Sequence, residues 1–597
     1  MIQRERYLVP LALLALAAAY ASPVFSPLRA IYSGNAVKDN DWLKIASFEH
    51  FARDSLAHGA LAKWCPYFGG GYPLIAHPED GSLSPLIIPS YLFGEEVGMK
   101  LQLVIALFLG AWGTYLAARR AFDFTAAAAG VSAVGLLVAG WMAWRVHYGW
   151  PMHFGYYLFP LVFYFTARAM EDRRWLLAAT ATMVVILQQI AQGLPFFFIF
   201  LLVWAVVCDL VKRRGIARGT HTLTVLALAV TTALTGALKV SGLVQLLGEN
   251  SRWAPYADYR PLEHFYAGFG EWGRFVVSEA DVFYKNIGLG WWLAALAALG
   301  IVLAWRRLWV LVPGVLLLVW IGLGPNAPVD LFVRLHRFPI FDAMHWPMKY
   351  TNFFVTFALC LCAGGAVDFV ARRVASRWRW LILAVALAPV LPMALAHMRL
   401  LNATFTKVEP PFPLVSTPFR QVAAYEGSPR GAARPIQANG YWLLRQNQGV
   451  IDWDGDLLLP EHATPAERIA RDGSRRPEPN YRGEVYLTAP GEVTWLQIGV
   501  NHFAVRGRLE RPGRVVLNQN FDLGWRGKPH HPMSENGLVA IPIDTGPFEV
   551  EFNYQPAWFG NGLAIALLSW VALGLFWWRE TRVRRKRLAE ENKSGSD

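Results

Sequence analysis

Carboxylates gather in one stretch of the sequence, between residues 38 and 86. Asp39 and Asp41 come first, and the apolar residues after them recur at helical spacing, which predicts a short amphipathic helix. A carboxylate held against a membrane surface can act in acid–base catalysis or bind a metal ion. A carboxylate just before a helix can instead cap the free N–H groups, and Asp39 fits that role as well as Asp41. The apolar face of the predicted helix comprises Ile45, Phe48, Ala52 and Leu56.

A second acidic spot lies near the end of the same stretch, where His77, Glu79 and Asp80 surround Pro78. Together with Asp41, these residues could hold a divalent cation such as Mg²⁺ or Mn²⁺ through oxygen ligands. The plainer interpretation is a turn around Pro78, and no complete ligand spacing is visible in the sequence. Three consecutive glycines at 69–71 favour a tightly folded loop before this spot.

The elements that must position these residues are membrane helices. The 597-residue chain is 54% hydrophobic, 14% aromatic and only 17% charged, which is typical of a polytopic membrane protein. Its net charge of +13 comes from basic residues at the ends of apolar segments, as the positive-inside bias predicts. That distribution argues against a nucleic-acid partner, which would require one basic patch. Three of the four cysteines fall in predicted spans, so no disulfide framework is indicated.

About twelve apolar segments approach the roughly 20 residues that a membrane-spanning helix needs. Basic clusters follow alternate segments, which predicts an even number of spans and places both termini in the cytoplasm. The N-terminal segment also fits a signal peptide, because a basic start and an apolar run precede small residues. The predicted spans lie near 7–26, 97–118, 124–144, 152–169, 176–190, 194–211, 222–243, 288–304, 308–324, 352–371, 380–396 and 561–578.

Four long loops then share the outer face, and we expect the function there. In chain order they are 38–86, 248–288, 325–350 and 399–560. Lys349 ends the third loop at a span entrance, where a fixed cation could neutralise a phosphate leaving group. A lysine at that depth can also simply snorkel to the lipid headgroups. Arg252 and Lys285 of the second loop are weaker candidates of the same kind, and His345 lies just before Lys349. Three further residues could line a cavity or only satisfy one another between helices: His147, His153 and Gln192.

The chain divides into a membrane part and an outer domain. We predict a transmembrane bundle with outer loops for 1–398 and an extracytoplasmic β-rich domain for 399–560. A final span at 561–578 and a basic cytoplasmic tail at 579–597 follow. Alternating apolar and polar residues between Gly, Pro and Asn turns indicate a small β-sandwich in the outer domain. The stretch from Pro410 to Arg476 looks irregular.

Several motifs in the stretch between 38 and 86 resemble the first outer loop of the YfhO-type bacterial membrane proteins, which belong to the GT-C class of integral-membrane glycosyltransferases. The stretch from Phe521 to Tyr554, followed directly by the last span, also resembles the C-terminal part of that family. The family usually has Asn at the position of Cys65 and Gln at that of Glu79, and this chain differs at both. The matching motifs are Asp41 before the amphipathic helix, Trp64 to Tyr67, Gly70 to Leu74 and Ala76 to Glu79.

The resemblance implies a GT-C-like bundle, with the first span retained, and a glycosyltransferase that uses a polyprenyl-phosphate-linked sugar. Asp41 would be the catalytic base, with Glu79 a second catalytic candidate that departs from the family. Lys349, with help from Arg252, would hold the phosphate. The sugar would pass with inversion to a cell-envelope glycan or polymer on the outer face of the bacterial cytoplasmic membrane, and the β domain would orient the acceptor.

Two other functions compete with this interpretation. A transporter or flippase of a lipid-linked glycan would place polar groups inside its spans near the midplane. The predicted spans are mostly apolar, and the polar residues cluster on one face, which favours chemistry at the surface. A non-catalytic envelope scaffold would use the β domain to bind a partner.

Overall fold

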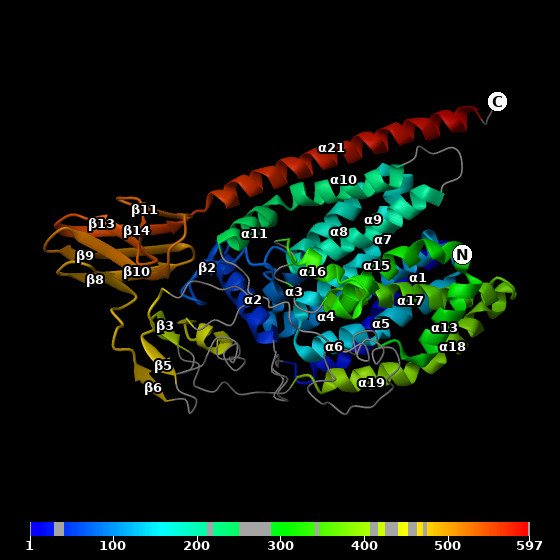
Figure 1. Cartoon of the computed structure of the whole chain (residues 1–597), viewed down its shortest axis with the longest axis horizontal. Coiled ribbons are helices and arrows are strands. Elements are labelled where there is room, and N and C mark those ends of the chain that lie inside the picture. The colour runs from blue at the N-terminus through cyan, green and yellow to red at the C-terminus, as the bar shows by residue number, and fades with distance from the viewer. Residues whose placement is uncertain are drawn as a thin grey trace.

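The computed structural model describes residues 2–28, 41–211, 219–249, 288–338, 341, 344, 347–405, 416–423, 440–451, 462–469 and 474–594. Helices form one part of the molecule, and the largest sheets lie together beyond one end of it (Figure 1). Helix α1 begins, and helix α21 ends, at the side of the helical part far from those sheets (Figure 1).

Among the described residues, eight helical segments are long and apolar enough to cross a membrane. This finding supports a membrane protein with a mainly helical fold and a β-rich C-terminal region. The segments comprise α1 (Ile2–Ala21), α4 (Glu95–Arg120), α5 (Ala126–Val138) with α6 (Gly140–Tyr148), α9 (Leu194–Val211), α14 (Trp305–Leu308) with α15 (Val312–Leu323), α17 (Pro347–Ala371), α18 (Arg379–Leu387) with α19 (Leu391–Asn402), and α21 (Ala557–Ser594).

The other four predicted spans are short or bent. Helices α8 (Leu176–Gln189) and α13 (Gly290–Leu303) have 14 residues each, and α7 (Phe159–Glu171) has 13 after a 3₁₀ turn. Helices α10 (Thr220–Thr235) and α11 (Ala237–Glu249) meet at an angle of 78°, so together they count as one broken span at most. A 14-residue helix is about 21 Å long, which is less than the hydrocarbon core of a bilayer. Hydropathy averages over such breaks, and the count of twelve spans therefore stays a prediction.

Helix α17 forms the centre of the bundle. Buried residues make up 83% of its apolar window, against 17% for α21. Helix α13 crosses α17 very closely at Gly300, where a Cβ atom would lie 1.7 Å from the Cys362 carbonyl oxygen, so only glycine fits. Aromatic rings fill the neighbouring layer, with the Phe159 and Phe354 ring centroids 4.8 Å apart.

The stretch that is predicted to form the first outer loop folds between the helices and the sheets. Helix α2 (Asp41–Ala57) is buried along most of its length, whereas Leu56, predicted on its apolar face, is 49% exposed at its last turn. A two-stranded hairpin follows, in which β1 (Trp64–Cys65) pairs with β2 (Tyr72–Pro73). Gly70 and Gly71 between these strands have φ of +77° and +99°, and a Cβ on Gly71 would overlap the Trp64 ring. Helices α3 (Ile88–Phe93) and α16 (Leu331–Leu335) complete the described helices.

Two four-stranded antiparallel sheets make up the C-terminal β region. Their strand orders are β12-β13-β10-β7 and β11-β14-β9-β8, and buried residues from both sheets form one hydrophobic cluster. Val515 pairs with Ile541 in the first sheet and Val505 with Val550 in the second. The strands are β7 (Val485–Leu487), β8 (Gly491–Gly499), β9 (His502–Leu509), β10 (Gly513–Asn520), β11 (Trp525–Lys528), β12 (Met533–Glu535), β13 (Leu538–Ile543) and β14 (Gly546–Tyr554).

A third sheet lies where the sequence looks irregular. Its strand order is β4-β3-β5-β6, with β3 parallel to both β4 and β5. The strands are too short to show a period of two, which explains why the pattern predicts no structure there. They are β3 (Arg420–Ala423), β4 (Gln448–Val450), β5 (Glu467–Ile469) and β6 (Arg475–Pro477).

Candidate active site

A buried lysine joins the two acidic spots that the sequence singles out. The Lys44 ammonium lies 3.2 Å from Asp41 Oδ1 and 2.7 Å from Glu79 Oε2. Lys44 and Asp41 share one face of α2 because they are three residues apart on a helix. All three side chains are buried, where an opposite charge offsets much of the cost of removing an ion from water. We call Asp41, Lys44 and Glu79 the carboxylate cluster.

Lys239 holds the turn that presents Glu79. Its ammonium donates to the carbonyl oxygens of Ile75 (3.1 Å), His77 (2.6 Å) and Asp80 (2.7 Å). His77 Nδ1 accepts the Glu79 N–H at 3.2 Å, so His77 also supports the turn. These contacts fix the backbone on both sides of Pro78 and point the Glu79 carboxylate toward α2.

Asp80 is engaged by its own loop. Its two carboxylate oxygens accept the N–H and the hydroxyl of Ser82, and the Lys239 ammonium lies 3.9 Å away. Burial raises the pKa of Asp80, although Lys239 and Ser82 oppose that rise. Thus Asp80 stabilises the turn, while Glu79 contacts Lys44.

The C-terminal β region, called the β domain below, contacts the β1–β2 hairpin that precedes this turn. The Trp64 indole N–H donates to Gln519 Oε1 at 3.0 Å, and Asn520 Nδ2 donates to the carbonyl oxygens of Gly69 (2.6 Å) and Gly71 (3.0 Å). The Trp64 ring also packs against Trp525 and Tyr554 of the domain core. Residues that are more than 430 positions apart therefore fix the loop that carries Glu79.

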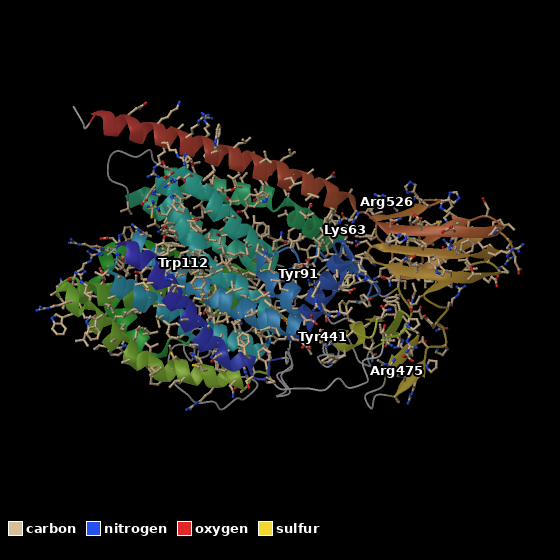
Figure 2. All side chains as sticks on the ribbon, turned by 180° about the vertical axis from the view of Figure 1, so that it is seen from behind. Lys63, Tyr91, Trp112, Tyr441, Arg475 and Arg526 are labelled. Carbon is tan, nitrogen blue, oxygen red and sulfur yellow. The ribbon has the colours of Figure 1, made fainter. Side chains whose placement is uncertain are left out.

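Further contacts reinforce this junction. Figure 2 shows Lys63 and Tyr441 where helices and sheets meet. The Lys63 ammonium lies 5.3 Å from the centroid of the Phe559 ring at the start of α21, and the Tyr441 hydroxyl donates to Glu95 Oε1 at 2.7 Å. The first loop, α4 and α21 are thus held together on the side of the helical part that faces the sheets.

Two cations and a tryptophan lie close together at the start of α17. The Lys349 ammonium is 4.2 Å from the centroid of the Trp150 ring, and the Arg145 guanidinium carbon is 4.7 Å from the same centroid. Arg145 Nη2 also donates to the Lys349 carbonyl oxygen at 2.9 Å. Aromatic faces attract cations, so Trp150 holds both charges in place. We call Arg145, Trp150 and Lys349 the cation cluster.

Two bridges connect the cation cluster with the carboxylate cluster. Gln192 Nε2 makes a long, 3.5 Å contact with Glu79 Oε1, and Tyr350, the neighbour of Lys349, donates its hydroxyl to Gln192 Oε1 at 3.2 Å. On the other side, the Trp42 indole N–H donates to the Val146 carbonyl oxygen at 2.9 Å, next to Arg145. Helices α2, α6 and α17 and the first outer loop therefore meet at one place.

The structure brings Asp41, Glu79 and the Lys349 region together but does not cover every predicted site residue. Lys44 was missed in the sequence, although its spacing of three from Asp41 was a usable signal. Arg145 was also missed, because it follows the predicted span at 124–144. The structure buries it inside an apolar segment, where an ionisable residue is by default a functional candidate. The centroid of the His153 ring lies 5.7 Å from that of Trp150 and 6.5 Å from that of Tyr350, beside the cation cluster. The predicted site residues that lie outside the described part of the chain are Asp39, Arg252, Lys285 and His345.

The carboxylate cluster does not suit a divalent cation. Such an ion needs several oxygen ligands around one point. Here the Lys44 ammonium contacts both carboxylates, and Asp80 is engaged by Ser82. Within the described residues, no group of three or more His, Cys, Asp or Glu side chains could hold a metal ion. We therefore derive no step through Mg²⁺ or Mn²⁺.

No family model and no curated protein sequence matches this chain. Solved structures with partial similarity include the arabinofuranosyltransferase AftD from Mycobacteria, at 16% identity and a TM-score of 0.45. The oligosaccharyltransferase of Archaeoglobus fulgidus, solved with Zn and sulfate, gives 13% and 0.40. The same organism's AglB, solved with an inhibitory peptide and a dolichol-phosphate, gives 14% and 0.41.

These matches cover 72–73% of this chain but only 31% of AftD, 61% of the oligosaccharyltransferase and 64% of AglB. The chain thus spans about a third of the length of AftD and less than two thirds of the two archaeal chains. Because every TM-score is below 0.5, we base neither the fold nor the function of this chain on them.

Proposed function

We propose that this chain is an integral-membrane glycosyltransferase of the bacterial cytoplasmic membrane. It moves a sugar from a polyprenyl-phosphate donor to a cell-envelope glycan or polymer on the outer face. The observation that carries this proposal is the meeting of the carboxylate cluster and the cation cluster, bridged by Gln192 and Tyr350. Sugar transfer from a phosphate requires a proton acceptor beside a cationic site for the leaving group.

Asp41 is the proposed base. The acceptor hydroxyl oxygen attacks the anomeric carbon while Asp41 takes its proton, and the bond from that carbon to the phosphate oxygen breaks with its electron pair. A single displacement of this kind inverts the configuration at the anomeric carbon. Asp41 lies in the first turn of α2, where the positive end of the helix dipole stabilises the carboxylate charge.

Lys349 and Arg145 are the proposed ligands of the leaving phosphate. Negative charge develops on the phosphate as the sugar departs, and fixed cations stabilise that charge more in the transition state than in the ground state. Trp150 restrains both side chains, which limits the reorganisation needed during the reaction.

Lys44 and Glu79 support the base in this proposal. Lys44 neutralises part of the charge of both carboxylates and fixes their separation. Glu79 contacts Gln192, so it also relays the position of the first loop to the helix that carries Lys349. The contacts that Gln519 and Asn520 of the β domain make with Trp64 and Gly69 support a role for that domain in positioning the acceptor next to Asp41.

The decisive experiment compares Asp41→Asn with Asp54→Asn, because Asp54 is an exposed carboxylate on the same helix. Membranes containing either variant are supplied with radiolabelled polyprenyl-phosphate sugars, and envelope glycans are analysed by mass spectrometry. We expect a loss of transfer of about 10²–10⁴-fold for Asp41→Asn and no change for Asp54→Asn. Full transfer by Asp41→Asn would remove Asp41 from the chemistry, and lipid-linked sugar crossing the membrane without transfer would favour the transporter.

A further inference from the structure

A long apolar crevice runs along one face of α10. We infer that it binds one acyl chain of an anionic glycerophospholipid, whose phosphate sits on Arg173. The crevice has a volume of about 670 Å³ and opens between α10 and the outermost helix, α21, with α7 and α8 behind it. Figure 1 shows α21 running beside α10. This inference is independent of the proposed glycosyl transfer.

The wall of the crevice behaves as apolar although it contains hydroxyl groups. The Thr224 hydroxyl donates to the Thr220 carbonyl oxygen at 2.9 Å, Thr235 to Thr231 at 2.6 Å, and Ser569 to Ile565 at 2.7 Å. Each hydroxyl thus bonds to its own helix and does not require a polar ligand. The remaining lining is mainly aliphatic, including Leu176, Leu223, Ala227, Leu234, Ala572 and Leu573.

The shape of the crevice fits an extended chain. Residues of α10 line it from Thr220 to Thr235, at spacings of three and four that mark one face of the helix. At 1.5 Å per residue, this face is about 22 Å long. A crevice of about 670 Å³ spread over that length is narrow, whereas a partner helix is about 10 Å in diameter. A single extended hydrocarbon chain is the occupant that matches the length and the apolar lining.

The charge at one end selects an anionic headgroup. Arg173 lines the crevice, and the described residues include no acidic side chain in an ion pair with it. The nearby carboxylate of Asp172 is already engaged, since Arg174 Nε lies 2.8 Å from it and Arg584 of α21 also contacts it. More arginines follow on the last part of α21. Lipid phosphate at the basic side of the bundle would therefore meet a guanidinium that the protein leaves available.

Helix α21 is only partly covered by the rest of the bundle. Only 17% of the apolar window of α21 is buried, and its exposed residues include Leu568 and Val571. The contact between Arg584 and Asp172 fastens α21 to the rest of the bundle beyond one end of the crevice. A chain filling the crevice would complete the packing between α10 and α21 along its length.

The test uses the full-length protein in detergent micelles, incubated with vesicles of phosphatidylcholine and phosphatidylglycerol in equal amounts, then repurified. Native mass spectrometry counts the retained lipids. We expect one phosphatidylglycerol per chain, and about fivefold less retention for Arg173→Gln. Arg174→Gln is the matched control, because that guanidinium is paired with Asp172, and it should retain lipid as the unchanged protein does.

A second variant, Leu573→Trp, fills the crevice and leaves Arg173 unchanged. It should abolish lipid retention. A thermal melt of each variant checks that it is folded. Equal retention of both lipids, no retained lipid, or undiminished retention by Leu573→Trp would each overturn the inference. Replacing the phosphatidylglycerol by polyprenyl phosphate extends the test, and preferential retention of the polyprenyl phosphate would assign the crevice to the donor lipid instead.

Discussion

Two clusters of charged residues lie in different parts of the helical bundle, and they are built differently. We call Asp368, Arg307 and Arg372 the basal cluster. Asp368 Oδ2 accepts from Arg307 (3.0 Å) and Arg372 (2.6 Å), while Asp368 Oδ1 accepts the Thr125 N–H. Both arginine side chains are 38% exposed, and the contacts join α5, α14 and α17. In the carboxylate cluster, two carboxylates share one ammonium and all three groups are buried.

The basal cluster joins helices to one another, whereas the carboxylate cluster holds groups that suit a reaction. The oxygens of Asp368 are occupied by two arginines and a backbone N–H at the start of α5, so the basal cluster is complete without a ligand. In the carboxylate cluster, two buried carboxylates contact one ammonium, and a second set of cations lies one bridge away at Lys349. Burying ionised groups is costly, and strongly perturbed ionisable groups gather at functional sites.

The largest effect is expected from removing the shared ammonium. Lys44→Met leaves Asp41 and Glu79 buried without their common cation, which we expect to cost about 3–5 kcal/mol of unfolding free energy. Denaturation in detergent micelles measures this loss. The double variant Lys44→Met with Glu79→Gln removes one of the two charges and should recover part of the stability. Equal stability of the single and double variants would mean that the two buried carboxylate charges do not cause the loss of stability.

Removal of the phosphate ligand should come next. We expect Lys349→Gln to lower kcat about 10²–10³-fold, because one fixed charge at the leaving group is lost. Arg334→Gln, an exposed residue of the same loop, is the control and should leave transfer unchanged. Initial rates at saturating donor measure the effect. A rise in KM with kcat intact would instead indicate that Lys349 binds the donor equally in the ground state and the transition state.

Within the described part of the chain, Glu49 of α2 has no paired cation, which sharpens the comparison. Burial raises the pKa of Glu49 to about 8, and the nearby charges of Glu95 and Asp80 add to the rise. The Gln102 amide, instead of an ammonium, contacts Glu49 at 2.8 Å. Glu49 thus retains its proton in the folded protein at pH values where the unfolded chain has lost it.

The contribution of Glu49 to stability should be full below its ordinary pKa of 4.5 and lost as the pH rises through about 8. Glu49→Gln removes this dependence, so its melting temperature should change less than that of the unchanged protein between about pH 5.5 and about pH 8.5. Parallel slopes for the two proteins would show that Glu49 is ionised in the folded state. Thermal melts in detergent micelles at four pH values are sufficient.

The sequence predicts the local part of this arrangement and not the long-range part. Hydropathy identifies membrane helices, and alternation identifies the strands from β7 onward, because both patterns depend on neighbouring residues. The break at Gly236 between α10 and α11 and the short strands β3 to β6 leave no periodic signal. The partnership of Lys44 with Glu79 is equally invisible, since it depends on how Lys239 and the β domain fold a distant loop.

The smallest effect is expected in the basal cluster. Arg307→Gln removes one guanidinium from Asp368, yet Arg372 still pairs with the carboxylate and the Thr125 N–H still donates to it. Arg307 is also partly exposed, so water replaces much of what is lost, and we expect a change of at most about 1 kcal/mol. Transfer activity should stay at its normal level, in contrast to Lys349→Gln. A loss comparable to that of Lys44→Met would mean that the two clusters differ less than their burial indicates.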